Sequence, residues 1–384
     1  MTDLRLTGFD PERIRRSVAA PTLDSLRARA RRRRTRNRIA AVGLLMVAVA
    51  APGLAATVGR QPDPPPARPA ATHLAYWDGQ VSVGYRNVHD SCEFEFARSG
   101  DGGASWSAPA GPDTQAYCLR DAGGMVVSRA EAHVLTPDVY LVGVGVTDHV
   151  STDAGRTWSD VTGTTLTVAA FPPWAVPVNC LTPCPDLRPP VAVDPVAGRL
   201  YRLADPPTEM GLVYVTADGA IWTAGSDPDG DGTALAVSTD RGATWQVTTV
   251  SARVVDGLAA RDAQEAFVLT SALGGDATAR STLWHTADGG QGWHDQPTSL
   301  PTVTAGALTI GDRGQLLVGH HGTHNILTWT STDDGVTFTA GTPTPPGSIG
   351  ALPGRMWTSG GSAPTPGQVT VDGTVWQSVP LPTQ

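Results

Sequence analysis

The amino-acid sequence predicts an all-β protein: a seven-bladed β-propeller of four-stranded antiparallel blades, with one transmembrane helix before it. One eight-residue pattern occurs five times, and its copies fit blades of roughly forty residues each. Around the copies, short alternating apolar runs are separated by Gly, Asp, Asn and Pro, which is typical of short strands and tight turns. Near the N-terminus, residues 39–58 carry no charge over about the length that a membrane-spanning helix needs.

The repeated pattern reads Ser/Thr-x-Asp-x-Gly-x-(Thr, Ser or Gly)-aromatic, and it predicts a tight turn between two strands. The copies are residues 99–106, 151–158, 238–245, 286–293 and 331–338. The Asp carboxylate can accept hydrogen bonds from the backbone N–H groups that follow it, and the first hydroxyl can join the same network. The Gly can adopt a positive φ without steric cost, and the aromatic residue then begins the returning strand as an apolar anchor.

This pattern resembles the Asp-box, or BNR repeat, of the sialidase superfamily and of sortilin-like (VPS10-type) propellers. In those proteins the box lies at the turn between the third and fourth strands of a blade, on the face away from the ligand site. The resemblance therefore implies a structural role for the five aspartates of the pattern, which are Asp101, Asp153, Asp240, Asp288 and Asp333.

The spacing of the copies divides the chain into blades. The seventh blade keeps only a shortened turn at residues 371–376, and the third has no copy and is expected to use residues 191–201 as its outer hairpin. Because residues 164–187 are poorly patterned, a six-bladed ring with an oversized third blade is the alternative. The seven expected blades span residues 73–111, 123–162, 164–206, 211–250, 254–296, 302–341 and 348–382.

Four segments are expected: a cytoplasmic Arg-rich tail (1–38), a transmembrane helix (39–58), a Pro-rich linker (59–72) and an extracytoplasmic propeller (73–384). The tail contains 12 of the 28 arginines against four acidic residues, and the chain contains no lysine. Positive charge beside an apolar span marks the cytoplasmic side, which predicts a cell-membrane protein with a cytoplasmic N-terminus. A cleaved signal peptide ending at the Ala-Val-Ala of residues 48–50 is the alternative.

The basic cluster directly precedes the apolar run, which argues for a membrane role and against nucleic acid as a partner. All-arginine usage with abundant Ala, Gly and Pro favours a bacterial source. Four cysteines in an oxidising compartment predict two disulfides. The expected pairs are Cys92–Cys118, which would join two loops of one face, and Cys180–Cys184, which would close a small loop.

If the repeated turns mark one face of the ring, the loops between second and third strands and between blades form the opposite face. The unusual polar residues of the chain are expected in those loops, where they would contact a ligand. These candidate binding residues are His89, Asp90, Asp148, His149, Arg188, His320, His321 and His324.

One loop on that face begins like a calcium site, with Asp227, Asp229 and Asp231 followed by Gly. An EF-hand would place Glu at the twelfth position, where this chain has Ser238. The open alternatives are therefore a calcium loop and an ordinary Asp/Gly turn, and no other cofactor is expected.

The expected function is that of a binding module for a protein, peptide or glycan at the loop face, with no catalytic residue assigned. The alternative is a glycoside hydrolase of the exo-α-sialidase type with a diverged active site. In that family an Arg-x-Pro motif precedes the first box, whereas here Arg188-Pro-Pro190 follows the second. A purely structural envelope protein is a third hypothesis.

Overall fold

The computed structural model describes most of the chain from residue 72 to residue 382. The described ranges are 72–88, 93–114, 130–144, 147–181, 190–227, 232–251, 254–271, 281–301, 306–322, 325–359 and 366–382. The chain divides into two units, Met1–Ala67 and Arg68–Gln384, and every described residue belongs to the second. The predicted tail and transmembrane span, and nearly all of the linker, therefore lie outside the described residues. Within the described ranges, no helix is long and apolar enough to cross a membrane.

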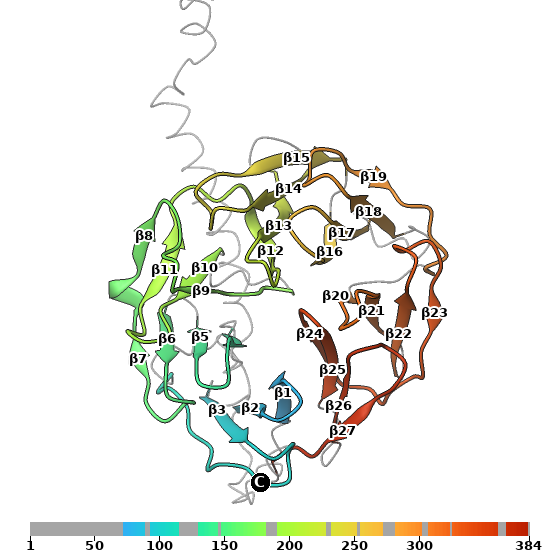
Figure 1. The fold of residues 1–384 in the computed structure, drawn as a ribbon. Coiled ribbons are helices and arrows are strands. Elements are labelled where there is room, and N and C mark those ends of the chain that lie inside the picture. Colours follow the sequence, from blue (N-terminus) through green and yellow to red (C-terminus); the bar gives the residue numbers. More distant parts are fainter. Residues whose placement is uncertain are drawn as a thin grey trace, which may run out of the picture. The chain divides into compact units, whose positions relative to one another are not determined.

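Seven sheets form a ring around a central axis (Figure 1). We number them as blades in chain order. Blade 1 contains β1 (Thr72–Trp77), β2 (Ser82–Val88) and β3 (Glu93–Ser99). Blade 2 contains β4 (Ala130–Val134), β5 (Tyr140–Val144), β6 (Thr147–Ser151) and β7 (Ser159–Asp160). Blade 3 contains β8 (Leu166–Val168), β9 (Val176–Pro177), β10 (Val191–Val193) and β11 (Leu200–Leu203), with the short 3-10 helix η2 (Thr162–Thr164) before β8.

Blades 4 to 7 each have four strands in sequence order. Blade 4 contains β12 (Glu209–Val215), β13 (Ile221–Ser226), β14 (Thr233–Ser238) and β15 (Gln246–Val250), and blade 5 contains β16 (Val254–Ala260), β17 (Ala266–Ser271), β18 (Thr282–Thr286) and β19 (His294–Asp295). Blade 6 contains β20 (Gly306–Ile310), β21 (Leu316–His321), β22 (Ile326–Ser331) and β23 (Thr339–Ala340). Blade 7 contains β24 (Ser348–Leu352), β25 (Arg355–Ser359), β26 (Gly367–Thr370) and β27 (Gln377–Val379).

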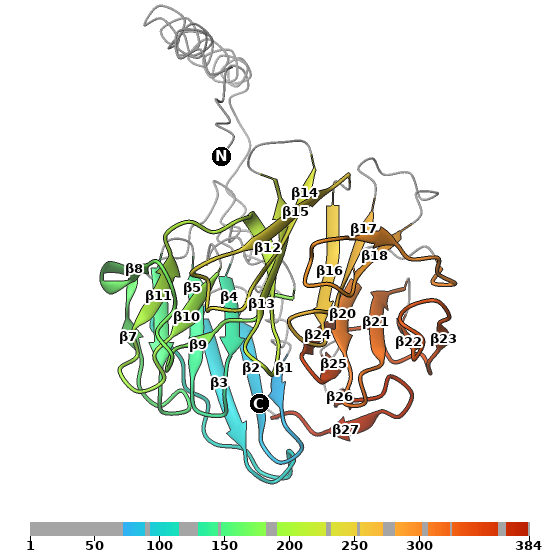
Figure 2. The same cartoon turned by 45° about the horizontal axis from the view of Figure 1, so that its top comes forward.

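The ring confirms the all-β prediction and decides between seven blades and six in favour of seven. Tilted in Figure 2, the strands of the blades run from one face of the ring to the other. Blade 1 has three named strands, and residues 107–110 take the place of the fourth. There the backbone N–H of Phe96 donates to the carbonyl of Ala110 at 2.8 Å.

Blade 3 differs from the prediction that residues 191–201 form its outer hairpin. The strand order is β8-β11-β10-β9, so the hairpin of β10 and β11 lies inside the sheet and β8 is outermost. β8 precedes the other strands in sequence and pairs with β11 in parallel. Because the outer strand is supplied first, the chain leaves β11 directly for blade 4, and blade 3 needs no turn from a third to a fourth strand.

The repeated pattern forms the predicted turn. In blade 4 the Ser238 hydroxyl donates to Asp240 Oδ1 at 2.8 Å and accepts the N–H of Gly242 at 2.7 Å. Thr244 donates its N–H to Asp240 Oδ1 and its hydroxyl to Oδ2, at 2.8 and 2.6 Å. The bonds from hydroxyl to Asp and from Gly to hydroxyl recur in the other four copies.

Backbone geometry explains two positions of the pattern. The fifth residue is Gly in each copy, and its φ lies between 77° for Gly290 and 96° for Gly103. The fourth residue also has a positive φ, although only two copies place Gly there. The non-glycine residues at this position are Ala154 (φ 61°), Arg241 (φ 63°) and Asp334 (φ 58°).

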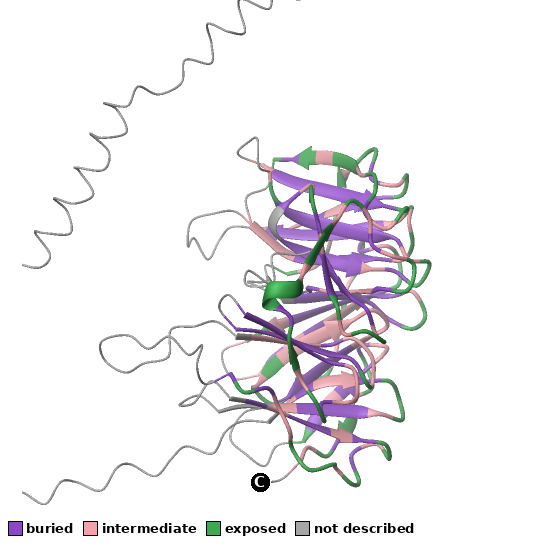
Figure 3. Ribbon diagram, turned by 90° about the vertical axis from the view of Figure 1, so that its left-hand side faces the viewer, coloured by how far each residue is buried: buried purple, intermediate pink, exposed green. Residues whose placement is uncertain are grey.

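Each copy follows the third strand of its blade, so the copies lie on one face of the ring, which we call the turn face. The opposite face, with the connections from second to third strands and from blade to blade, is the loop face. Figure 3 shows buried residues along the strands and exposed residues in the turns at the edge of the ring. The core therefore lies between neighbouring sheets, as where Trp293 of blade 5 meets Trp222 of blade 4 edge to face at 5.9 Å.

The ring closes between blade 7 and blade 1 without a shared strand, since both sheets are built from their own segments of chain. The N–H of Leu74 donates to the Ser359 hydroxyl at 2.9 Å. The Arg355 guanidinium donates to the carbonyl of Trp77. Leu74 and Trp77 share a buried apolar cluster with Trp357 of blade 7.

Candidate functional site

A cavity of about 320 Å³ lies on the ring axis between blades 1, 2, 3 and 7. We call it the axial cavity. Its walls come mainly from β1, β4, β9 and β24, each the innermost strand of its blade (Figure 1). The polar and aromatic residues that line it are His73, Tyr85, His133, Asn179, Ser348, Trp357 and Ser359.

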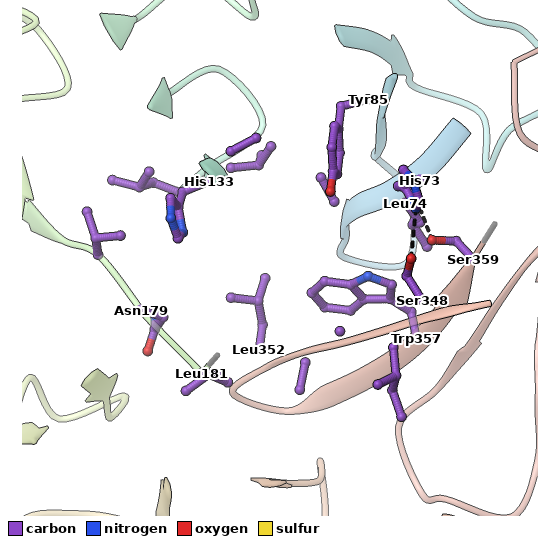
Figure 4. A pocket seen from close by; sticks show the side chains of 18 of the residues that line it. His73, Leu74, Tyr85, His133, Asn179, Leu181, Ser348, Leu352, Trp357 and Ser359 are labelled. Carbon is purple, nitrogen blue, oxygen red and sulfur yellow. Dashed lines mark hydrogen bonds between the residues drawn. The ribbon is translucent and has the colours of Figure 1, made fainter. Parts of the chain in front are cut away.

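One wall of the cavity crosses the junction where the ring closes (Figure 4). The Ser348 hydroxyl of blade 7 and Nδ1 of His73 in blade 1 are hydrogen-bonded at 3.0 Å. The His73 ring lies 5.3 Å from the ring of Tyr85, at an interplanar angle of 31°. His73 and Ser348 stand at the start of β1 and β24, which is the loop-face end of these strands.

Trp357 forms the aromatic wall next to this junction. Its indole packs so closely over Gly350 that a Cβ added to that glycine would lie 2.6 Å from the ring. The glycine therefore makes room for the indole at the cavity. Ser359, two residues further along β25, accepts the Leu74 N–H and fixes the strand against blade 1.

Asn179 of blade 3 forms the facing wall. Its side-chain oxygen accepts the N–H of Val215 at 2.8 Å, which ties blade 3 to the end of β12. The amide nitrogen is the donor group of the side chain. A primary amide carries two donors on that nitrogen, so Asn179 contributes donor capacity to the cavity.

Two titratable residues of β4 lie beside the cavity, at alternate positions of the strand and so on one face of it. His133 lines the cavity, whereas Glu131 is not among its lining residues. The Oε2 atom of Glu131 and the Nε2 atom of His133 are 3.9 Å apart, and both are buried without a hydrogen-bond partner among the described residues. An unpaired buried polar atom costs about 1–3 kcal/mol, so this arrangement lowers the stability of the fold.

The described lining of this cavity contains no permanently charged side chain. No Asp, Glu, Arg or Lys is among these lining residues, although the whole chain carries a net charge of −8. Burial raises the pKa of Tyr85, so its hydroxyl stays neutral and can donate a hydrogen bond at ordinary pH.

A second cavity of about 540 Å³ lies among turn-face segments of blades 5, 6 and 7, and we call it the turn-face cavity. Its arginines are Arg261 and Arg313. The Arg261 guanidinium pairs with Glu265 at 2.5 Å and with Asp334 at 2.7 Å. It also lies over the Phe267 ring at 5.2 Å, so Arg261 is held in place as a link between blades 5 and 6.

The structure places only some of the predicted binding residues. His89, Asp90, Arg188 and His324 lie outside the described residues, as do Asp229, Asp231, Cys92, Cys118 and Cys184. The predicted disulfide pairs and the predicted calcium loop therefore stay predictions. Cys180 is buried and pairs through its backbone with Val213.

Asp148 and His149 were expected in a loop but lie in β6, where both are buried. Val144 already pairs with Thr147, so the connection between β5 and β6 is too short to hold them. Asp148 pairs with Arg202 of blade 3 at 3.8 Å. Burial lowers the pKa of His149, so this side chain is neutral at ordinary pH.

The remaining predicted residues do not line the axial cavity. His320 and His321 end β21 in blade 6, and His320 lies 6.0 Å from the ring of Trp329. Asp227 follows β13 and accepts the Thr249 hydroxyl at 3.2 Å. Among the described residues, no group of three or more His, Cys, Asp or Glu could hold a metal ion.

The axial cavity lies apart from the residues that the sequence predicted for ligand binding. A usable signal existed in β4, where Glu131 and His133 alternate with small apolar residues in a strand that should be buried. Alternation of that kind indicates one polar face on an innermost strand. It does not indicate which other strands face it.

No family model matches this chain, and no curated protein matches it either. Solved structures that resemble it include the Hadza microbial sialidase Hz136, at 15% identity over 76% of this chain and 63% of that one, with a TM-score of 0.41. A Trypanosoma rangeli sialidase in complex with 2,3-difluorosialic acid matches at 12% identity over 80% and 52%, with a TM-score of 0.38. YCF48 bound to D1 peptide matches at 15% identity over 81% and 82%, with a TM-score of 0.32.

The chain spans less than two thirds of the length of both sialidases. These similar structures are β-propellers with sequences far from this one. Their similarity concerns the fold alone and does not indicate what this chain binds or does.

Proposed function

We propose that this protein is a membrane-anchored, extracytoplasmic binding module. Its propeller would take a protein, peptide or glycan on the loop face and hold one group of that ligand in the axial cavity. The axial cavity carries the proposal, because its lining combines apolar walls with a few hydrogen-bonding side chains. Ligand sites have this make-up, and the volume of about 320 Å³ falls in their usual range of about 300–1,000 Å³.

The loop face is the side from which a ligand would reach the cavity. His73 and Ser348 mark the loop-face end of β1 and β24, and their hydrogen bond joins the first blade to the last. The predicted binding residues His89, Asp90, Arg188 and His324 belong to connections on this face in the proposal. They would contact the parts of the ligand that extend beyond the cavity.

The repeats have a structural role in this proposal and would be Asp-boxes of the BNR type. Both carboxylate oxygens of Asp240 accept hydrogen bonds from its own turn, which leaves little capacity for a ligand. The N-terminal segment 39–58 would anchor the propeller in the membrane, with the disulfides Cys92–Cys118 and Cys180–Cys184 on the loop face. The proposed source of the chain is bacterial.

Sialidase-type hydrolysis is the competing function. That chemistry needs arginines to bind the substrate carboxylate, and the described lining of the axial cavity contains none. Binding is therefore the function that the lining supports better.

The test is a binding screen with the full-length chain on a glycan array and a displayed peptide library. Asn179→Asp in the axial cavity is the test variant, and Arg313→Ala in the turn-face cavity is the matched control. Binding that Asn179→Asp weakens and Arg313→Ala leaves intact is the expected result. Turnover of a fluorogenic sialoside by the wild-type chain would replace the binding module with the hydrolase.

A further inference from the structure

The lining of the axial cavity selects against charged ligands. Its described side chains carry no permanent charge, so an ionised group would lose its hydration there without gaining a counter-charge. The carboxylate of Glu131, 3.9 Å from Nε2 of His133, would add repulsion for an anion. Its Oε2 atom is buried and Glu131 does not line the cavity, so this oxygen cannot contact a cation there.

The aromatic walls favour a ligand with an apolar face. Trp357 lies on one side, and the adjacent rings of His73 and Tyr85 lie on another (Figure 4). Aromatic rings contribute large, rigid apolar areas with polar edges. The face of a sugar ring, which presents C–H groups, packs on such a surface.

The polar groups favour a ligand with hydroxyls around its edge. Asn179 offers an amide donor, and the hydroxyls of Tyr85 and Ser348 can each donate or accept. A purely apolar ligand would offer no acceptor to the Asn179 amide. A hydroxyl is both donor and acceptor, so it can satisfy either kind of group.

We infer that the axial cavity is a subsite for one uncharged sugar ring, stacked on Trp357 and hydrogen-bonded by Asn179. The inference rests on the proposed binding function and specifies the chemical class of the group that the cavity holds. It excludes acidic sugars such as sialic acid and cationic groups from this subsite.

The test uses isothermal titration of the full-length chain with glucose, galactose, mannose and N-acetylglucosamine as neutral probes. N-Acetylneuraminic acid and choline are the charged probes. The expected result is saturable binding of at least one neutral sugar and of neither charged probe. A charged probe that binds while every neutral sugar fails would overturn the inference.

Asn179→Asp is the decisive variant, because it keeps the oxygen that accepts the Val215 N–H and removes the amide donor. It should weaken sugar binding about tenfold or more, the effect of losing one hydrogen bond at a buried site. Trp357→Ala should weaken it further, but that variant also removes a buried side chain from the ring closure. Arg313→Ala should bind as the wild type does.

Two outcomes separate this inference from the proposed function. If a peptide or protein binds the loop face, no sugar binds, and Asn179→Asp changes nothing, the sugar subsite is wrong and the binding module stands. If no probe and no library member binds the wild-type chain, both fail.

Discussion

The turn face and the axial cavity are built in opposite ways. On the turn face, five copies of one pattern make one set of hydrogen bonds, each within eight consecutive residues. In the axial cavity, each blade contributes different side chains, and the bonded pair His73 and Ser348 is 275 residues apart in sequence. The comparison indicates that the repeated turns, which most blades share, stabilise the ring. The side chains of the axial cavity, which differ from blade to blade, would determine its specificity.

The largest expected loss of stability comes from adding a side chain where the turn of blade 1 packs against the C-terminal segment. In Gly103→Ala the new Cβ would lie 2.7 Å from the carbonyl oxygen of Pro380, and φ is 96°. We expect the free energy of unfolding to fall by about 2–4 kcal/mol, since overpacking and backbone strain add. Chemical denaturation of the full-length chain measures it.

The matched control is Gly102→Ala, the neighbouring position. Its φ is 69° and nothing lies within 4 Å of the added Cβ, so only the backbone strain of about 1 kcal/mol applies. Equal losses in the two variants would mean that Pro380 moves away from the added Cβ at no cost, which contradicts tight packing between this turn and the C-terminal segment.

The next effect concerns the closure of the ring between blades 7 and 1. Ser359→Ala leaves the buried N–H of Leu74 without its acceptor, which should cost about 1–3 kcal/mol. Ser348→Ala, which removes the exposed bond to His73, should cost less than about 1 kcal/mol. Thermal unfolding of both variants compares them, and a larger loss for Ser348→Ala would mean that the bond to His73 stabilises the closure more than the bond to Leu74 does.

Acid should destabilise the turn face. Hydrogen bonds from the Ser105 side chain, the Ser105 N–H and Ser99 lower the pKa of Asp101 from 3.8 to about 2. Similar bonds lower the pKa of Asp240 and Asp333. Between the folded and unfolded values the unfolded chain binds more protons, so this stability is present above about pH 4 and is lost as the pH falls toward 2.

Urea midpoints at about pH 5 and about pH 3 measure this loss. Asp101→Asn should show a smaller drop between the two pH values than the wild type. An unchanged drop would mean that Asp101 does not contribute to the acid sensitivity.

The smallest effect should be a gain. Ala154 has φ 61° in a position where two other copies carry Gly, so Ala154→Gly should raise stability by about 0.5–1 kcal/mol. Arg241→Gly removes the same strain but also the bonds from the guanidinium to the carbonyls of Pro172 and Ala175, at 2.7 and 2.6 Å. Denaturant midpoints should therefore rise for the first variant and fall for the second.

The sequence was enough to predict the turns because their hydrogen bonds are local. The network lies within residues 238–244, and the spacing of the copies then gives the blades. The strand order of blade 3 could not be predicted, because the parallel pairing of β8 with β11 joins segments more than thirty residues apart. No local sequence pattern encodes such a pairing.

The cavity could not be predicted for a related reason. Which side chains face one another depends on the closing of the ring, and neither Asn179 nor Trp357 belongs to a motif. The unusual residues that the sequence offered instead, such as Asp148 and His149, belong to a buried strand at the contact with blade 3. The unusual polar pair in the sequence therefore marks a contact between blades 2 and 3, and it does not mark the lining of the cavity.

The measurement that tests the account most directly is thermal unfolding of the full-length chain with and without the best-binding neutral sugar, for Asn179→Asp and Asp240→Asn. The account predicts that Asn179→Asp loses the sugar-induced shift in Tm, because it removes the amide donor from the cavity. Asp240→Asn should lower the Tm and keep the shift, because it changes one turn. A sugar-induced shift that survives in Asn179→Asp and disappears in Asp240→Asn would contradict the division between a repeated scaffold and an unrepeated site.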